Sequence, residues 1–118
     1  MKMSEFEALA AAAVASLPEF FRAKLDNVVV VAEYAPPPRL GGRRNFSLLG
    51  LYEGVPADRR GSWYSGQMPD KITLFKRNIE KSCSGPGEIK ACVEKTVRHE
   101  IAHHFGISDS ELLEKGLY

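Results

Sequence analysis

The order of the predicted elements indicates an α+β protein, in which helices cover one side of a small sheet of three to four strands. Three observations predict this class. A helical hydrophobic repeat opens the chain, three short apolar segments typical of strands follow it, and the longest helical pattern lies near the C-terminus. Because the 118 residues, 44% of them hydrophobic, can bury one modest core, we expect a single domain over residues 1–118.

The first helix is predicted from apolar residues that recur at helical spacing between positions 3 and 17. Ser4 and Glu7 have the spacing of a capping box at its start, and Pro18 ends it. Residues 19–25 then predict a short second helical segment. Its apolar side chains are expected to cover the core, and they are Phe20, Phe21 and Leu25.

Three segments predict strands. The run 27–32 is continuously apolar and rich in valine, which is typical of a strand covered on both faces near the middle of a sheet. Residues 47–54 and 71–75 are the other two candidates, the former with glycine inside and after it. Between the first two strands, the glycine pair within 39–44 predicts a mobile basic loop. Residues 56–66 predict a long surface connection.

The longest helix is predicted over about 88–105, after a helical turn at 78–82 and a break at 84–87. Its apolar residues share one broad arc and its charged residues the opposite one, so we expect a half-buried helix. Cys92 lies two turns before His99 on the margin of the apolar arc. Cys92 could therefore serve as a metal ligand, but a small buried thiol is the favoured interpretation.

A sequence of the form HExxHxxGxxD lies at the end of this helix. Positions four apart stack on one face of a helix, so His99 and His103 can hold one zinc ion, with Glu100 beside them as a base. Gly106 allows the chain to leave the helix in a left-handed turn. A residue three positions further on can then return toward the metal as a third ligand, and that residue is Asp109.

Two polar residues of this region have alternative interpretations. Asp109 could cap a short C-terminal helix instead of binding metal. Ser108 and Glu111, however, have the spacing of a capping box, which would leave the Asp109 carboxylate free to face the metal. His104 projects about 100° away from His103, so we expect it to pack in the core or behind the metal ligands.

The charge balance argues against nucleic acid as a partner. The chain has 16 Lys and Arg against 15 Asp and Glu, a formal charge of +1, and so lacks the excess that binding to a phosphate backbone requires. Five arginines cluster in segments predicted to be loops, where solvated charge is the favoured interpretation. They are Arg39, Arg43, Arg44, Arg59 and Arg60.

The sequence also argues against a membrane protein. The apolar run at 8–17 follows Glu5 and Glu7, whereas a secretory signal has a positive leading segment, and no stretch is long enough to span a bilayer. Two cysteines, Cys83 and Cys92, are too few for a disulfide scaffold and fit a reducing compartment. We expect a cytoplasmic protein, and a monomer is assumed.

The HExxH motif resembles that of the zincin metallopeptidases, and its HExxHxxGxxD extension resembles the metzincin branch. The match is closer to the small bacterial zincin-like proteins called minimal metallopeptidases. The resemblance is carried by residues 48–54, 69–75 and 99–109. It departs from metzincins in having Asp in place of the usual third histidine and no methionine turn after it.

This resemblance implies a minimal zincin-like fold with zinc on His99, His103 and Asp109 and with Glu100 as the general acid and base. In zincins an edge strand above the cleft holds the substrate by backbone pairing. By order along the chain, that strand would be residues 48–53. The expected substrate contacts are then Leu49, Gly50, Leu51 and Tyr52.

Two functions fit these features. The leading one is zinc-dependent hydrolysis of a peptide bond in a peptide or protein substrate. The alternative is a non-catalytic zinc-binding module of the same fold that interacts with a partner protein. Two histidines and one carboxylate are also compatible with Fe, Mn or Co.

Overall fold

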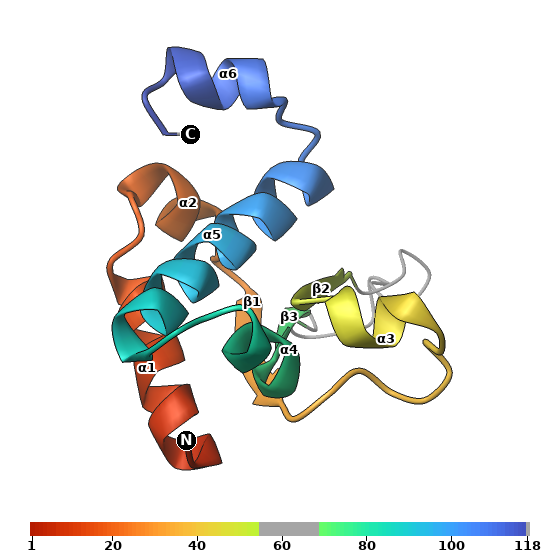
Figure 1. Ribbon diagram of the computed structural model, residues 1–118. Helices are drawn as coiled ribbons and strands as arrows, with labels where there is room; N and C mark the ends of the chain where they lie inside the picture. The colour runs from red at the N-terminus through yellow and green to blue at the C-terminus, as the bar shows by residue number, and fades with distance from the viewer. Residues whose placement is uncertain (55–68, 118) are drawn as a thin grey trace.

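The computed structural model describes residues 1–54 and 69–117, and the surface connection predicted at 56–66 lies outside these ranges. The described residues form an α+β fold, which confirms the predicted class (Figure 1). Its elements in chain order are α1 (Met3–Ala15), α2 (Glu19–Lys24), β1 (Val28–Glu33), α3 (Arg43–Ser47), β2 (Gly50–Glu53), β3 (Asp70–Phe75), α4 (Lys76–Lys81), α5 (Pro86–His104) and α6 (Asp109–Glu114).

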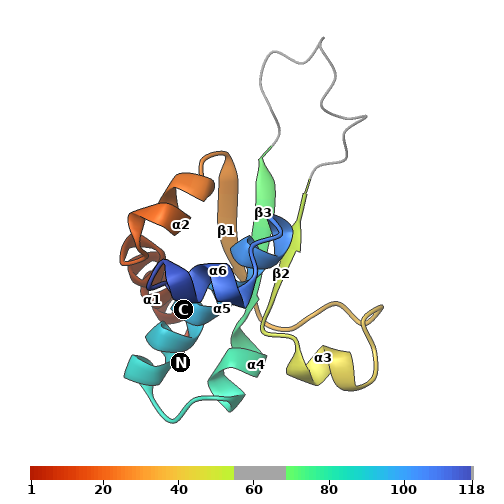
Figure 2. The same ribbon diagram turned by 90° about the horizontal axis from the view of Figure 1, so that it is seen from above.

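The sheet has the order β1-β3-β2, and Figure 2 shows β3 between the other two strands. β1 runs parallel to β3, whereas β2 is antiparallel to it, with Gly50 opposite Leu74. The prediction of a central strand at 27–32 is wrong, because β1 lies at the edge and its Val29 and Val31 are 42% and 37% exposed. A valine-rich run reports strand propensity, not two-sided burial. The central strand is β3.

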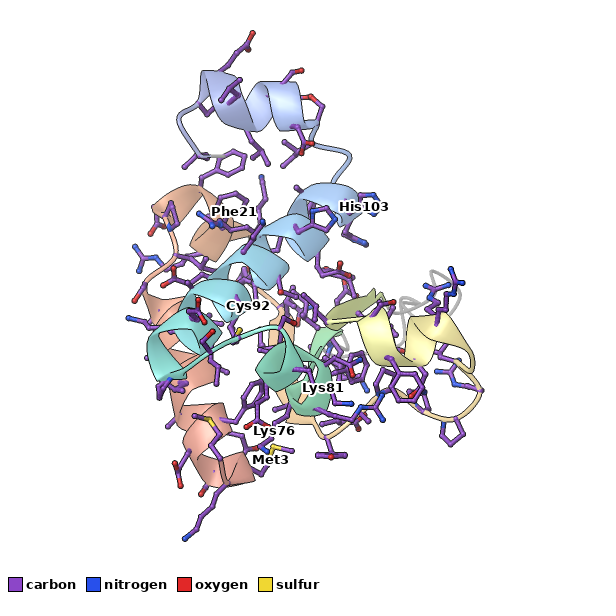
Figure 3. The ribbon with its side chains drawn as sticks, in the orientation of Figure 1. Met3, Phe21, Lys76, Lys81, Cys92 and His103 are labelled. Atoms are coloured by element: carbon purple, nitrogen blue, oxygen red, sulfur yellow. The ribbon has the colours of Figure 1, made fainter. Side chains whose placement is uncertain are left out.

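The core lies between the sheet and the helices α1, α2 and α5. Phe6 of α1, Phe21 of α2 and Leu74 of β3 are fully buried in it, and in Figure 3 Phe21 lies between α2 and α5.

The predicted capping box of Ser4 and Glu7 is wrong. α1 already begins at Met3, and the Phe6 N–H donates to the Lys2 carbonyl at 3.0 Å, so Ser4 lies inside the helix.

The segment before β2 is more ordered than the sequence predicts. Residues Arg43–Ser47 form α3, so the loop predicted at 39–44 is wrong for its last two positions, and β2 begins only at Gly50. α4 secures this segment from outside: Asn78, 2% exposed, donates hydrogen bonds to the carbonyls of Asn45 and Leu48 at 2.9 and 2.7 Å. Tertiary hydrogen bonds thus stabilise α3, for which local sequence gives no signal.

Candidate metal and active site

The two histidines of the HExxH motif lie one turn apart on the exposed side of α5. The ring centroids of His99 and His103 are 5.5 Å apart with an angle of 19° between the rings. The opposite side of the same turns is fully buried through Val97 and Ile101, which confirms the predicted half-buried helix. Figure 3 shows His103 projecting from α5 away from α2. Both imidazoles are therefore held on a rigid element and open to solvent.

α5 ends in the left-handed turn that the sequence predicts at Gly106, which has a φ of +67°. The Gly106 N–H donates to the His103 carbonyl at 3.3 Å, and the Ile107 N–H donates to the Ala102 carbonyl at 2.8 Å. This is the Schellman arrangement, in which a residue without Cβ adopts positive φ at low cost. The turn fixes where the chain continues after the second histidine.

Asp109 is the first residue of α6, and Ser108 is its N-cap. The Ser108 hydroxyl accepts a hydrogen bond from the Glu111 N–H at 3.2 Å, so the capping role falls on serine as predicted. Asp109 is exposed and shares a cavity of about 470 Å³ with His99. His103 lines a different cavity. In the described ranges, no group of three His, Cys, Asp or Glu side chains is arranged to hold a metal ion.

Glu100 faces the edge of β2 that points away from β3. Its Oε1 accepts a hydrogen bond from the Tyr52 N–H at 3.1 Å. Glu100 and Tyr52 line a cavity of about 370 Å³ that also includes both motif histidines. β2 can pack closely against α5 because residue 50 is glycine. A Cβ at this position would lie 2.8 Å from the Thr96 methyl group. The acid of the motif thus contacts an element distant from it in sequence.

His104 lies at the rim of the same cavity. The prediction that it packs in the core is wrong, because its side chain is 39% exposed. Its ring stacks on Tyr52, with centroids 3.9 Å apart and an angle of 16°. Asp70, to which the sequence analysis assigns no role in the site, accepts a hydrogen bond from the Tyr52 hydroxyl at 2.8 Å. Asp70 belongs to the segment 69–75 but not to the HExxHxxGxxD motif, and the pairing of β2 with β3 brings it here.

A second, more apolar groove of about 580 Å³ extends from His99 and Glu100 along α5. Its lining includes Leu48, Leu49 and Cys92. Cys92 is partly buried and packs against the core, as the favoured interpretation of this thiol predicts. Burial and the neighbouring Cys92 raise the pKa of Cys83 to about 11, so the Cys83 thiol stays protonated at neutral pH and is a poor metal ligand.

A family model of zincin-like metallopeptidases matches residues 25–117. The chain belongs to this family. Among curated proteins, none matches the chain. Membership in the zincin-like metallopeptidases implies zinc binding and suggests peptidase activity on peptide substrates. Within residues 1–54 and 69–117, no helix is both long and apolar enough to cross a membrane.

The donor groups present fit the metal that this family implies. Zinc is bound in proteins by imidazole nitrogen, thiolate and carboxylate oxygen, with three protein ligands in catalytic sites. His99 and His103 offer two exposed imidazoles on one face of α5, and Asp109 offers an exposed carboxylate that shares a cavity with the first of them. These donors are of the chemical types that zinc takes in proteins, although no three of them in the described ranges are arranged around one point.

Proposed function

We propose that this chain is a single-domain, zinc-dependent peptidase that binds one zinc ion per chain. His99 and His103 would hold the metal, and Asp109 would be the third ligand. The observation that carries the proposal is the shared cavity of the two motif histidines, Glu100 and residues of β2. A base and two metal-binding side chains therefore adjoin a strand edge suited to an extended peptide.

The place of Glu100 in the cavity of the two motif histidines supports a role as general base. When bound, zinc polarises the scissile carbonyl and lowers the pKa of a water molecule. Glu100 takes a proton from the attacking water and delivers it to the nitrogen of the leaving amine. One of its oxygens accepts the Tyr52 N–H, which fixes the orientation of the carboxylate while the second oxygen serves the proton transfer.

An extended substrate would lie along β2. The residues proposed to contact it are those of the strand edge and its approach: Leu49, Gly50, Leu51 and Tyr52. Their place in the linings of the two cavities at the motif supports this assignment. Backbone pairing along a free strand edge gives affinity, and the apolar groove beside Leu49 would receive one side chain of the peptide.

The test uses protein purified without chelator and without a nickel resin. We expect one zinc per chain and cleavage of members of a peptide library. Glu100→Gln keeps zinc but lowers kcat by about 100-fold or more, because it removes the general base. Glu94→Gln, the same change at another position of α5, is the matched control and should cleave normally. Undiminished cleavage by Glu100→Gln would overturn the mechanism.

A second function has one observation in its favour. Asp109 and His103 line separate cavities, which suits a protein that binds zinc without the closed arrangement of an active peptidase. A non-catalytic zinc-binding module that interacts with a partner protein would take up zinc, gain thermal stability from it and cleave no member of the library. The same preparation therefore separates the two functions.

A further inference from the structure

The backbone N–H and C=O groups of β2 point alternately toward two neighbouring elements, β3 on one side and α5 on the other. The Leu49 carbonyl accepts from the Phe75 N–H of the neighbouring strand at 3.0 Å, so Leu49 faces β3. Polar backbone groups alternate in direction along an antiparallel strand, which turns those of Gly50 and Tyr52 toward the edge that points away from β3. At that edge the Tyr52 N–H binds Glu100 Oε1 at 3.1 Å. The orientation of Glu100 therefore depends on where β2 lies.

β2 needs further contacts near Tyr52 to keep its position, because it is a short strand. It has four residues, Gly50–Glu53, and β3 is its partner in the sheet. A short strand at a sheet edge is expected to open locally more readily than the core. A hydrogen bond from its backbone would then hold Glu100 only intermittently, unless side chains fix the strand against α5.

The Tyr52 side chain has contacts that supply this support. On one face its ring stacks against His104, the last residue of α5, at 3.9 Å between centroids. The Tyr52 hydroxyl donates a hydrogen bond to Asp70 Oδ2 at 2.8 Å, and Asp70 is the first residue of the central strand β3. His104 Nε2 lies 4.0 Å from the same Asp70 oxygen. One tyrosine thus joins β2 to both α5 and β3.

We propose that Tyr52 and His104 are positioning residues that hold the β2 backbone against Glu100 and thereby orient its carboxylate for proton transfer. We call Tyr52, His104 and Asp70 the tyrosine clamp. The clamp rests on the proposed role of Glu100 as base. His104 acts through its ring face, so an aromatic ring at position 104 is what the clamp requires, not an imidazole nitrogen.

Kinetics on the zinc-loaded protein separate positioning from direct catalysis. His104→Ala removes the stacked ring and is expected to lower kcat by about tenfold to a hundredfold, with zinc content unchanged. His104→Phe restores a flat ring and should recover most of kcat. If His104→Phe is as slow as His104→Ala, the imidazole itself is needed and the clamp is overturned.

The hydroxyl contact is tested by Tyr52→Phe, which keeps the ring and removes the bond to Asp70. We expect a smaller loss of kcat than in His104→Ala, of about threefold to tenfold, which corresponds to one net hydrogen bond. Tyr34→Phe is the matched control, because Tyr34 is 60% exposed and lies outside the site. An unchanged kcat in Tyr52→Phe would contradict the role of Asp70 in the clamp.

Amide hydrogen exchange of the metal-free protein tests the clamp without cleavage. The Tyr52 amide should exchange at least about tenfold faster in Glu100→Ala and in His104→Ala than in the wild type, whereas His104→Phe should keep it protected. The Leu51 amide, which faces β3, is the internal control. Equal Tyr52 exchange in all four proteins would overturn the clamp. Absence of cleavage together with the expected exchange pattern would overturn the proposed function alone.

Discussion

At the residue scale, Ser108 and Asp109 are neighbours in one turn with different roles. The serine caps α6, and the carboxylate beside it is exposed next to the cavity that includes His99. A cap and a metal ligand make separable contributions, because the first stabilises the helix with or without metal and the second acts only when metal is bound.

Asp109→Ala is predicted to weaken zinc binding by at least about tenfold, since removal even of groups that only support metal ligands costs that much. Ser108→Ala is expected to keep zinc affinity within about twofold but to lower the free energy of unfolding by about 1 kcal/mol. Competition with a chromogenic chelator measures the first effect, and urea denaturation of the metal-free protein measures the second. Equal zinc affinity in both variants would exclude Asp109 as a ligand.

Gly50 is the second residue whose role is specific to its position. A Cβ at this residue would lie 2.8 Å from Thr96 Cγ2 and 3.2 Å from the Thr73 carbonyl oxygen. Gly50→Ala is therefore predicted to push β2 from α5 and to lower the free energy of unfolding by about 1–3 kcal/mol. The displaced strand should also weaken the bond between the Tyr52 N–H and Glu100.

Thr96→Ser tests whether this steric contact is the cause. Serine lacks the methyl group that the new Cβ would meet, so Gly50→Ala combined with Thr96→Ser should recover part of the lost stability, measured as a coupling in a double-mutant cycle. Gly87→Ala is the control, because no atom lies within 4 Å of a Cβ at Gly87 and alanine favours the helix. Additive effects of the two changes would contradict the steric explanation.

At the element scale, α4 determines where the segment before β2 lies. Asn78 of α4 donates to the carbonyls of Asn45 and Leu48, one in α3 and one directly after it. Arg77 adds bonds at 2.6 and 2.8 Å to the Asn45 carbonyl and side-chain oxygens. α3 and the start of β2 are thus secured by an element that follows them by some 30 positions in sequence.

Asn78→Ala is predicted to lower the free energy of unfolding by about 2 kcal/mol, because it removes the donor to the Leu48 carbonyl from a buried position. Ser47→Ala serves as the control. Its hydroxyl is exposed and bonds only within α3, to the Arg43 carbonyl, so a change below about 0.5 kcal/mol is expected. Urea unfolding curves of the two variants make the comparison, and similar losses in both would show that the buried amide has no special role.

At the scale of the whole molecule, Glu80 joins distant parts of the chain. It accepts a hydrogen bond from Lys76 at 2.7 Å and one from the amino group of Met1 at 2.8 Å. The hydrogen bond from Lys76, followed by the one from the amino group, holds the pKa of Glu80 below its ordinary value of 4.5. This contact connects the start of α1 with α4.

The sign of the pH dependence follows from that shift. The folded protein binds the Glu80 proton more weakly than the unfolded chain does, so the contribution is complete above pH 4.5 and is lost as the pH falls through the lowered pKa. The difference in Tm between wild type and Glu80→Gln should therefore be greatest near about pH 7 and shrink below pH 4.5.

Glu19→Gln is the control for this pH series. It removes an ion pair with Arg22 whose two side chains are 76% and 49% exposed, and such pairs contribute under about 1 kcal/mol. Calorimetry of the three proteins from neutral to acidic pH makes the measurement. A Glu80→Gln difference that stays constant down to the lowest pH would contradict the assignment.

Features that depend on neighbouring positions follow from the amino-acid sequence alone. The α+β class, the long helix, its buried face, the left-handed turn at Gly106 and the cap at Ser108 all follow from spacings of a few residues. Backbone geometry alone fixes such contacts, since i and i+4 share a helix face whatever surrounds them. For the same reason the HExxH spacing sufficed to place two imidazoles side by side on α5.

Only the tertiary structure decided which distant segments meet. Strand order sets the position of β1 at the sheet edge and brings Asp70 next to Tyr52. The packing of β2 against α5 sets the hydrogen bond from Tyr52 to Glu100 and the stacking of His104 on Tyr52. Side-chain pattern specifies how much of an element is buried, but not its partner, because many partners bury the same apolar area equally well. The surroundings of the HExxH motif were therefore set by long-range packing and not by the motif.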